Sequence, residues 1–485
     1  MQDLPFRSAK ELASLIRRKK VSALELLDLY LARVERHNPA LNAVVAMDVG
    51  QARKRARAAD RALAKGKPWG PLHGVPMTIK ESFDVAGLPT TWGLPAYADN
   101  IAKHSSVPVE RMEAAGVVLF GKTNVPAWLA DWQSYNAVYG TCNNPWDVTR
   151  TPGGSSGGSA AVLAAGLTGI EAGSDIGASI RNPAHYCGVY GHKPTYEICA
   201  SRGQALPGVL SGSDIAVIGP MARSADDLDI ALTALAGPDA IEAGGWQLRL
   251  PPSRKKTLRE FKVAVVLNDP NGEVDREIQD RLQELADFLS KKMKVKVADA
   301  HPDIDTTDAH RTYIHLLRMA TCGRQTDEDF ARNREIAEGL AKSDDSYYAR
   351  MMRANTGSHR DWLAHNEKRR HLQWAWHEFF QSYDILLCPA ASSTAFAHNH
   401  EGNRWDQKIV VNGKPVSVID QMFWAGYPGV VYLPATVAPA GLGASTGLPL
   451  GVQIVGPFGG DRSTIRFAQL LAKEWHGYTP PPGFS

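Results

Sequence analysis

One stretch rich in glycine and serine, residues 151–183, constrains this chain more than any other part of it. It contains the run GGSSGG at residues 153–158, which leads into the alanine-rich residues 159–167 with their strong helix propensity. Glycines allow positive φ and close approach of another group, and the first turn of a helix leaves amide N–H groups without partners. The stretch therefore predicts a loop closed by a helix start, a place that favours anions or oxyanions.

The second part of the stretch, DIGASIR at residues 175–181, places Ser179 directly after small residues. Consecutive amides can point at one spot there, which is the geometry that an oxyanion hole needs.

The first part of the stretch, residues 153–158, also satisfies the GxSxG pattern of the α/β-hydrolase nucleophile elbow. That elbow requires a preceding strand, whereas residues 143–152 are polar and contain two prolines. A phosphate-binding loop is disfavoured because no lysine follows the glycines.

Alternating helix and strand patterns predict an α/β fold. The pairs Ser8/Glu11 and Ser22/Glu25 form capping-box patterns followed by apolar residues at helical spacing, and the second helix is expected to end near residues 38–39. Residues 237–253, rich in glycine and proline, predict a linker or surface loop, and residues 307–380 are expected to be mostly helical. Further strands are expected at 42–47, 75–80, 116–120, 261–267, 295–298, 383–389 and 448–455, and helices at 50–65, 108–115, 225–236, 274–292 and 462–475.

Charge and cysteine usage exclude several classes of protein. The formal charge is only +3 over 485 residues and the basic clusters lie on helical patterns, so we expect no nucleic-acid partner. No run approaches the 18 or so apolar residues of a membrane span, and the N-terminus lacks a signal-peptide pattern, so we expect no membrane association. Five scattered cysteines without a CxxC pair indicate a reducing, cytoplasmic location.

Two histidine-containing segments could suggest a metal site. Residues 398–401 (HNHE) lack further ligands at a suitable spacing, and His377-Glu378 does not complete an HExxH pattern. We therefore expect neither a metal nor another cofactor.

Three blocks, in order along the chain, resemble the amidase signature family: GVPMTIK at residues 74–80, GGSSGG at 153–158 and DIGASIR at 175–181. The 24-position interval between Ser155 and Ser179 agrees with that family, and weaker similarities occur at residues 120–124, 144–147, 191–195 and 447–453. The resemblance implies an α/β fold with a large mixed β-sheet flanked by helical layers. It also implies a single domain over residues 1–485, with a signature core at about 70–235 and a more variable helical portion at about 240–380.

The resemblance implies a Ser-cis-Ser-Lys triad, in which Ser179 is the nucleophile, Ser155 the bridging serine after a cis peptide bond, and Lys80 the base. The chemistry is consistent, because a serine hydroxyl needs a base within hydrogen-bond reach and a lysine can serve if it is neutral. Lys80 must then be buried, since an ordinary lysine is charged at neutral pH.

The expected oxyanion donors are the backbone N–H groups of Ile176, Gly177, Ala178 and Ser179. Family members commonly have two glycines before the nucleophile, whereas this chain has Gly177-Ala178. The Ala178 methyl group narrows the site if this residue needs positive φ.

Residues around the triad have more than one interpretation. Asp175 and Arg181 form either a structural ion pair or backbone anchor, or act directly in function. Ser156 either donates to Lys80 or caps the following helix. Aromatic residues in loop-like sequence indicate an apolar substrate pocket, with core packing as the alternative; they are Trp128, Trp132, Tyr135 and Trp424.

The sequence thus predicts an amidase that hydrolyses the C–N bond of a small, apolar or aromatic amide through a Ser179 acyl-enzyme. Carbamates, anilides, hydrazides and esters fit the same mechanism. Another possibility is a component of a complex that acts on glutamine, like the amidase-fold component of the tRNA-dependent amidotransferase. A non-catalytic binding protein of the same fold is the third. We expect a small-molecule amide as the partner and leave a homodimer open.

Overall fold

The structure is a computed structural model that describes residues 3–484. Its centre is an eight-stranded mixed sheet with the order β10-β9-β11-β15-β14-β7-β8-β6, beside a three-stranded sheet with the order β1-β3-β2. A parallel bridge between Met77 and Ile170 links the two sheets at β2 and β6. The strands are β1 (Val44–Met47), β2 (Pro76–Lys80), β3 (Val118–Thr123), β6 (Glu171–Asp175), β7 (Tyr190–Lys193), β8 (Val217–Ala222), β9 (Lys262–Val265), β10 (Lys296–Asp299), β11 (Ile385–Pro389), β14 (Ala435–Leu442) and β15 (Pro449–Val455).

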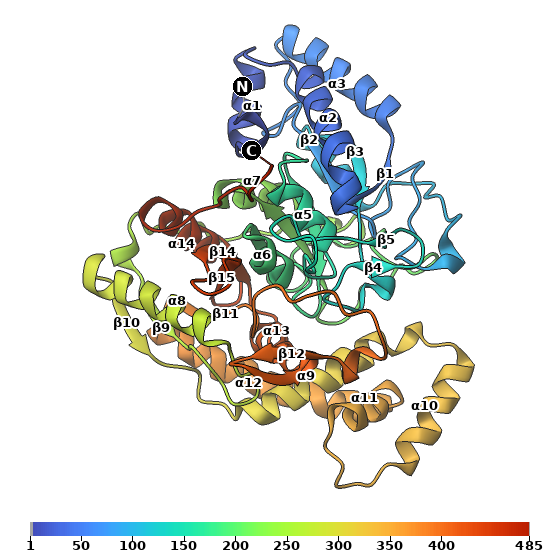
Figure 1. Cartoon of the computed structure of the whole chain (residues 1–485), viewed down its shortest axis with the longest axis vertical. Helices are drawn as coiled ribbons and strands as arrows, with labels where there is room; N and C mark the ends of the chain where they lie inside the picture. Colours follow the sequence, from blue (N-terminus) through green and yellow to red (C-terminus); the bar gives the residue numbers. More distant parts are fainter. Residues whose placement is uncertain (1–2, 485) are drawn as a thin grey trace.

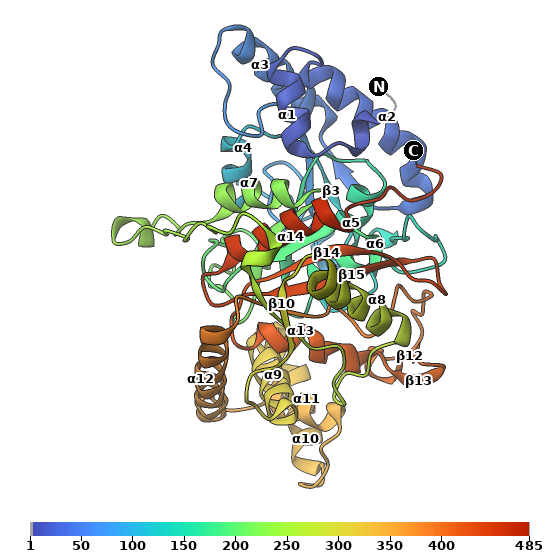
Figure 2. The ribbon, with the colours of Figure 1, turned by 90° about the vertical axis from the view of Figure 1, so that its left-hand side faces the viewer.

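Helices surround this sheet, which confirms the predicted fold class. Figures 1 and 2 show the N-terminal helices gathered at one end of the molecule and α9 to α12 at the other, with the sheet between them. The helices are α1 (Ala9–Arg17), α2 (Ala23–Leu41), α3 (Val49–Ala64), α4 (Val107–Ala114), α5 (Gly157–Ala164), α6 (Arg181–Cys187), α7 (Ala225–Leu235), α8 (Arg276–Asp287), α9 (Thr306–Thr321), α10 (Asp327–Gly339), α11 (Tyr347–Asn355), α12 (His359–Ser382), α13 (Met422–Gly429) and α14 (Asp461–Glu474). Over residues 3–484, none of them combines the length and apolar character needed to traverse a bilayer.

Local sequence signals located most helix starts correctly. Both capping boxes are present, with the Ser8 and Ser22 hydroxyls accepting from the backbone N–H groups three residues later. The second helix does not end near residues 38–39 as expected. It continues to Leu41 with Pro39 in its last turn, because Asn42 adopts φ 47° and donates its N–H to the Asn38 carbonyl at 2.7 Å.

Several short elements escaped the sequence patterns. Strands β7, β8 and β14 and helices α6 and α13 are almost entirely buried, so they lack the alternation between apolar and polar residues that marks a half-exposed element. Two small hairpins were also missed: β4 (Tyr135–Asn136) with β5 (Gly140–Thr141), and β12 (Lys408–Val411) with β13 (Lys414–Ser417). Residues 237–253 form the expected irregular connection, with one short turn of helix at Glu242–Gly244.

Helix α5 fixes the position of the glycine-serine loop, because all eight of its residues are buried. A Cβ atom on Gly158 would lie 2.4 Å from the backbone nitrogen of Asn124 and 2.9 Å from the carbonyl oxygen of Ala43. The backbone of the helix therefore packs directly on two other backbone segments, and only glycine allows this approach.

Replacing Gly158 with alanine is expected to destabilise the fold, since the clash is with backbone that cannot rotate away. Overpacking of this kind typically costs about 1–3 kcal/mol. Urea unfolding of Gly158→Ala compared with wild type measures the loss. The matched control is Gly339→Ala at the end of α10, where a Cβ meets nothing within 4 Å. Equal midpoints for both variants would contradict the packing argument.

Candidate active site

Lys80 lies at the junction of the two sheets. It is the last residue of β2, and β6 runs parallel beside β2, so both strands end at the same edge. Two serines contact the lysine at this edge. Ser174 lies near the end of β6, and Ser155 lies in the loop before α5. Lys80 Nζ lies 2.6 Å from Ser155 Oγ, 3.0 Å from Ser174 Oγ and 3.4 Å from the Ser174 carbonyl oxygen. The Lys80 side chain is fully buried.

Burial lowers the pKa of Lys80 to about 7, against the opposing attraction of Asp175 and Glu171. Burial likewise raises the pKa of Glu171 to about 8, with Thr78 donating to this carboxyl group. Near neutral pH a large fraction of the Lys80 amine is therefore uncharged. A neutral amine has two N–H donors and one lone pair. If the donors go to the Ser174 carbonyl and hydroxyl, the lone pair faces the Ser155 hydroxyl.

An ion pair between Asp175 and Arg181 shapes the loop that carries Ser179. Arg181 Nη2 donates to Asp175 Oδ1 at 2.8 Å, and Nε donates to Oδ2 at 3.0 Å. The same carboxylate accepts the N–H groups of Ala178 and Ile180, both at 3.0 Å. Burial alone raises the pKa of Asp175, but Arg181 and these donors outweigh it and hold the pKa below its usual value. The pair is thus a backbone anchor for the loop.

The loop carbonyls at Ile176 and Gly177 are fixed by two aromatic side chains. Tyr313 Oη donates to the Ile176 oxygen at 3.1 Å, and Trp132 Nε1 donates to the Gly177 oxygen at 2.8 Å. Neighbouring N–H groups in such a turn can converge on one point, as the oxyanion prediction requires. Ala178 adopts φ 65°, the left-handed conformation that costs a non-glycine residue about 1–2 kcal/mol.

One of the four expected oxyanion donors is otherwise engaged. The Ala178 N–H donates to Asp175, so it is not free for a substrate oxygen. Within residues 3–484 the structure records no hydrogen-bond partner for the N–H groups of Ile176, Gly177 and Ser179. The prediction of oxyanion donors is accordingly narrowed to these three amides.

The two serine-bearing loops are tied together through their backbones. The Ser156 N–H donates to the Ser179 carbonyl at 3.0 Å, and the Gly154–Ser155 peptide bond is cis. Among the described residues no hydrogen bond joins the Ser155 and Ser179 hydroxyls, although both line one cavity. Ser156 Oγ donates to the Ser174 carbonyl at 3.4 Å, so it neither contacts Lys80 nor caps α5 as the two interpretations expected.

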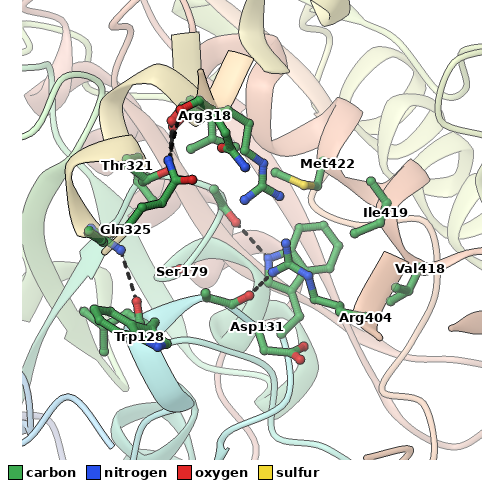
Figure 3. Close-up of a pocket in the computed structure, with 18 of the residues that line it drawn as sticks. Trp128, Asp131, Ser179, Arg318, Thr321, Gln325, Arg404, Val418, Ile419 and Met422 are labelled. Atoms are coloured by element: carbon green, nitrogen blue, oxygen red, sulfur yellow. Dashed lines mark hydrogen bonds between the residues drawn. The ribbon is translucent and has the colours of Figure 1, made fainter. Parts of the chain in front are cut away.

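Two cavities meet at Ser179. The Ser155 cavity, of about 330 Å³, is lined on its reactive side by Ser155, Ser174, Ser179 and Gln204. The Trp132 cavity, of about 320 Å³, is lined by Trp128, Trp132, Ser179 and Met422, but not by Ser155. Figure 3 shows the Trp132 cavity with Val418, Ile419 and Met422 on one side and Trp128, Thr321 and Gln325 on the other. Ile176, Leu129 and Arg324 border both cavities.

Comparison with known proteins decides which family this arrangement represents. The family model described as Amidase matches residues 25–465. The chain belongs to the amidase family. It is 30% identical to the A subunit of the glutamyl-tRNA(Gln) amidotransferase of Anaeromyxobacter dehalogenans (strain 2CP-C), over 96% of this chain and 95% of that one. It is 32% identical to the indoleacetamide hydrolase of Bradyrhizobium diazoefficiens (strain JCM 10833), over 92% and 82% respectively.

A solved structure agrees with the family at the level of the fold. A bacterial aryl acylamidase of the amidase signature family superposes with a TM-score of 0.81 at 24% identity, covering 97% of this chain and 96% of the other. Members of the family hydrolyse C–N amide bonds, and this chain is an enzyme of that kind. Over residues 3–484 no group of three or more His, Cys, Asp or Glu side chains is gathered in a way that could hold a metal ion.

Two aromatic residues predicted for the pocket lie elsewhere in this amidase. Tyr135 stacks on His400 with 3.8 Å between the ring centroids, and it lines neither of the two cavities. Trp424 is fully buried in α13 and donates its Nε1 to the Gly272 carbonyl at 2.7 Å. Both predictions rested on aromatic clustering in the sequence, which does not distinguish a core residue from a pocket residue. Trp128 and Trp132 do line the Trp132 cavity.

Sequence reasoning missed five side chains of the site. Ser174 directly precedes the recognised block at residues 175–181, which was the one signal available for it. Gln204 donates to Ser174 Oγ at 3.3 Å from a loop without a pattern. The others are arginines brought to the Trp132 cavity by distant segments: Arg318, Arg324 and Arg404.

We expect a fluorophosphonate, whose phosphorus is attacked by an activated serine with loss of fluoride, to phosphonylate Ser179. The labelling rate should fall about tenfold per pH unit below pH 7, because protonated Lys80 cannot accept the proton, and level off above that pH. Mass spectrometry locates the label, and stopped time points over pH 5–9 give the rate. Lys80→Met should slow labelling by about 100-fold or more.

Ser179→Ala is the control for the site of labelling. A rate that is flat from pH 5 to 9, or a label on another serine, would contradict the assignment of Lys80 as the base.

Proposed function

We propose that this chain hydrolyses a linear amide through a covalent acyl-enzyme on Ser179, with Ser155 and Lys80 relaying the proton. The observation that supports it most strongly is a fully buried lysine, with its pKa lowered to about 7, in contact with the Ser155 hydroxyl. An amine in that state is a base at neutral pH, and its place beside Ser155 gives it a proton to accept.

In the first half-reaction, Ser179 Oγ attacks the carbonyl carbon while its proton passes to Ser155 Oγ. The Ser155 proton passes in turn to Lys80 Nζ. The carbonyl oxygen becomes an oxyanion that accepts from the amides of Ile176, Gly177 and Ser179. The hydrogen bond between the Ser179 and Ser155 hydroxyls, which the structure does not record among the described residues, is expected to form when substrate binds, as catalytic hydrogen bonds often tighten in the complex.

Collapse of the tetrahedral intermediate breaks the C–N bond. The departing nitrogen takes the proton that returns from Lys80 through Ser155 and leaves as an amine or ammonia. Water then attacks the Ser179 ester by the same relay and releases the carboxylic acid. No group outside the chain, water and substrate is needed to balance these steps.

The two cavities can be assigned to the two halves of the substrate. The leaving nitrogen must receive its proton from Ser155, which lines the Ser155 cavity and not the Trp132 cavity. The amine therefore occupies the Ser155 cavity and the acyl group occupies the Trp132 cavity. The indole rings of Trp128 and Trp132, with Ile419 and Met422, give the acyl group an apolar wall.

This wall favours an apolar or aromatic acyl group close to the scissile bond, which is consistent with the similarity to an indoleacetamide hydrolase. Carbamates, anilides, hydrazides and esters remain substrates compatible with the mechanism. Esters are chemically easier to cleave than amides, so they are expected as side substrates.

A role on glutamine within a larger complex is the second candidate. It is supported by the 30% identity to the A subunit of a glutamyl-tRNA(Gln) amidotransferase over almost the whole length of both chains. The isolated chain distinguishes the two candidates. Release of ammonia or amine from simple amides without any other protein favours the hydrolase, whereas activity restricted to glutamine and dependent on partner chains favours the complex.

We expect the purified chain to release ammonia from phenylacetamide and hexanamide faster than from acetamide. A larger apolar acyl group gains burial against the tryptophans, at about 25 cal/mol per Å². Trp128→Ala should reduce this preference, since Trp128 lines the cavity but its indole anchors no loop carbonyl. The measurement is kcat/KM for each amide, with Ser179→Ala as the inactive control.

Trp132→Phe separates the two roles of Trp132. It keeps an aromatic wall but removes the N–H that holds the Gly177 carbonyl, so we expect kcat to fall by about tenfold for all amides with the order of preference unchanged. Amine release by Ser179→Ala at the wild-type rate would contradict the proposed mechanism altogether.

A further inference from the structure

Three arginines border the Trp132 cavity without a carboxylate partner. Arg318 comes from α9, Arg324 from the turn that follows it, and Arg404 from the 3-10 turn Arg404–Asp406. Within residues 3–484, none of them forms an ion pair with an acidic side chain at 4.0 Å or less. The Trp132 cavity therefore carries cationic groups that the protein itself leaves uncompensated.

Their hydrogen bonds go to neutral oxygens. Arg324 Nη1 donates to the Trp128 carbonyl at 3.1 Å and its guanidinium lies over the Trp92 ring. Arg404 donates to the Ala130 carbonyl, and Arg318 donates to the Tyr347 hydroxyl. The Nε of Arg318 is buried and has no hydrogen-bond partner among the described residues. A guanidinium has five donors, so most of this donor capacity is unused.

Two carboxylates also border the cavity, and they do not cancel the arginines. Asp329 is paired with a fourth arginine, Arg332, on the exposed side of α10. Asp131 accepts from the Gln133 N–H at 3.1 Å, and burial raises its pKa against the opposing effect of Arg404. Burial acts to raise the pKa of Tyr347, which accepts from Arg318, yet Arg318 and Arg404 lower it overall. The three arginines therefore outnumber the two carboxyl groups that border the cavity, one of which already has its own arginine partner.

We propose that the acyl half of the substrate ends in a carboxylate that binds Arg318 and Arg404. The inference rests on the proposed function, because it uses the assignment of the acyl group to the Trp132 cavity. Guanidinium groups bind carboxylates through paired N–H donors, and arginines without an acidic partner are stabilised by an anionic ligand. The apolar wall of Ile176, Ile419 and Met422 suits the methylene chain between the amide and the acid. The substrate class is thus the monoamide of a dicarboxylic acid.

The test compares adipic acid monoamide with hexanamide, which has the same chain length and a methyl group in place of the carboxylate. We expect wild type to show a kcat/KM for the anionic amide about tenfold or more above that for the neutral one. Arg318→Gln and Arg404→Gln should each lower the value for the anionic amide by about 10- to 100-fold and change hexanamide by less than about threefold. Arg404→Lys, which keeps the charge, should lose less than Arg404→Gln.

Arg334→Gln is the matched control, since Arg334 lies on the same helical portion but pairs with Glu338 in solvent. It should leave both substrates unchanged. Thermal midpoints of all variants show whether they are folded. Equal kcat/KM values for the two amides in wild type, or an equal loss for both in the arginine variants, would overturn the inference and leave the amidase proposal intact.

Binding separates the inference from the proposed reaction. Calorimetry with Ser179→Ala should show adipate binding that weakens by about 10-fold or more when Arg404→Gln is added. If neither amide is hydrolysed but adipate binds in this way, the reaction is wrong and the anion site stands. If hexanamide is hydrolysed and adipate does not bind, the reaction stands and the anion site is wrong.

Discussion

The site depends on keeping the Lys80 amine away from water and from a contacting carboxylate. An ammonium group in that position loses its hydration and gains no ion pair, so the uncharged amine becomes accessible near neutral pH. The sheet junction creates this environment, because β2 and β6 end side by side and surround the amine with serine hydroxyls and a carbonyl. Glu171 is close enough to affect Lys80 electrostatically, but its own burial favours the protonated form.

A second buried ionisable group near the site is stabilised in its charged form. Asp175 remains ionised because Arg181 and three backbone N–H groups satisfy it. Arg181 is held in turn by the Gln453 side chain at 2.8 Å and the Ala425 carbonyl at 3.0 Å. Such a pair is costly to desolvate, and it is retained where it fixes a geometry. Here it holds the Ser179 loop to β15 and α13, and its carboxylate accepts the N–H of Ala178, which has a left-handed conformation.

The helical portion beyond residue 240 contributes to the walls of the two cavities. The sequence predicted only a more variable helical portion there. In the structure, α9 and the turn after it contribute a wall to both cavities, through residues such as Arg318, Ala320 and Arg324. The proposed reacting groups come from the sheet and the glycine-serine loops, whereas the cavity walls come from α9 and the turn after it together with residues 128–132 and 418–422. The chemistry and the choice of substrate are therefore carried by different segments.

The sequence by itself determined the family, the α/β class and the capped helices, and it predicted the residues of the proposed proton relay. These follow from local signals: capping boxes, apolar periodicity, and glycine-serine blocks whose order and spacing are specific. The sequence could not determine which side chains line the cavities or which hydrogen bonds the site residues form. Tyr135 and Trp424 resembled pocket residues and lie elsewhere, Ala178 was expected to offer an amide that Asp175 occupies, and no pattern marked Ser174, Gln204 or the three arginines. Most of those assignments depend on contacts between segments tens to hundreds of residues apart, the Ala178–Asp175 hydrogen bond depends on the fold of its loop, and burial and unpaired charge exist only once the chain is folded.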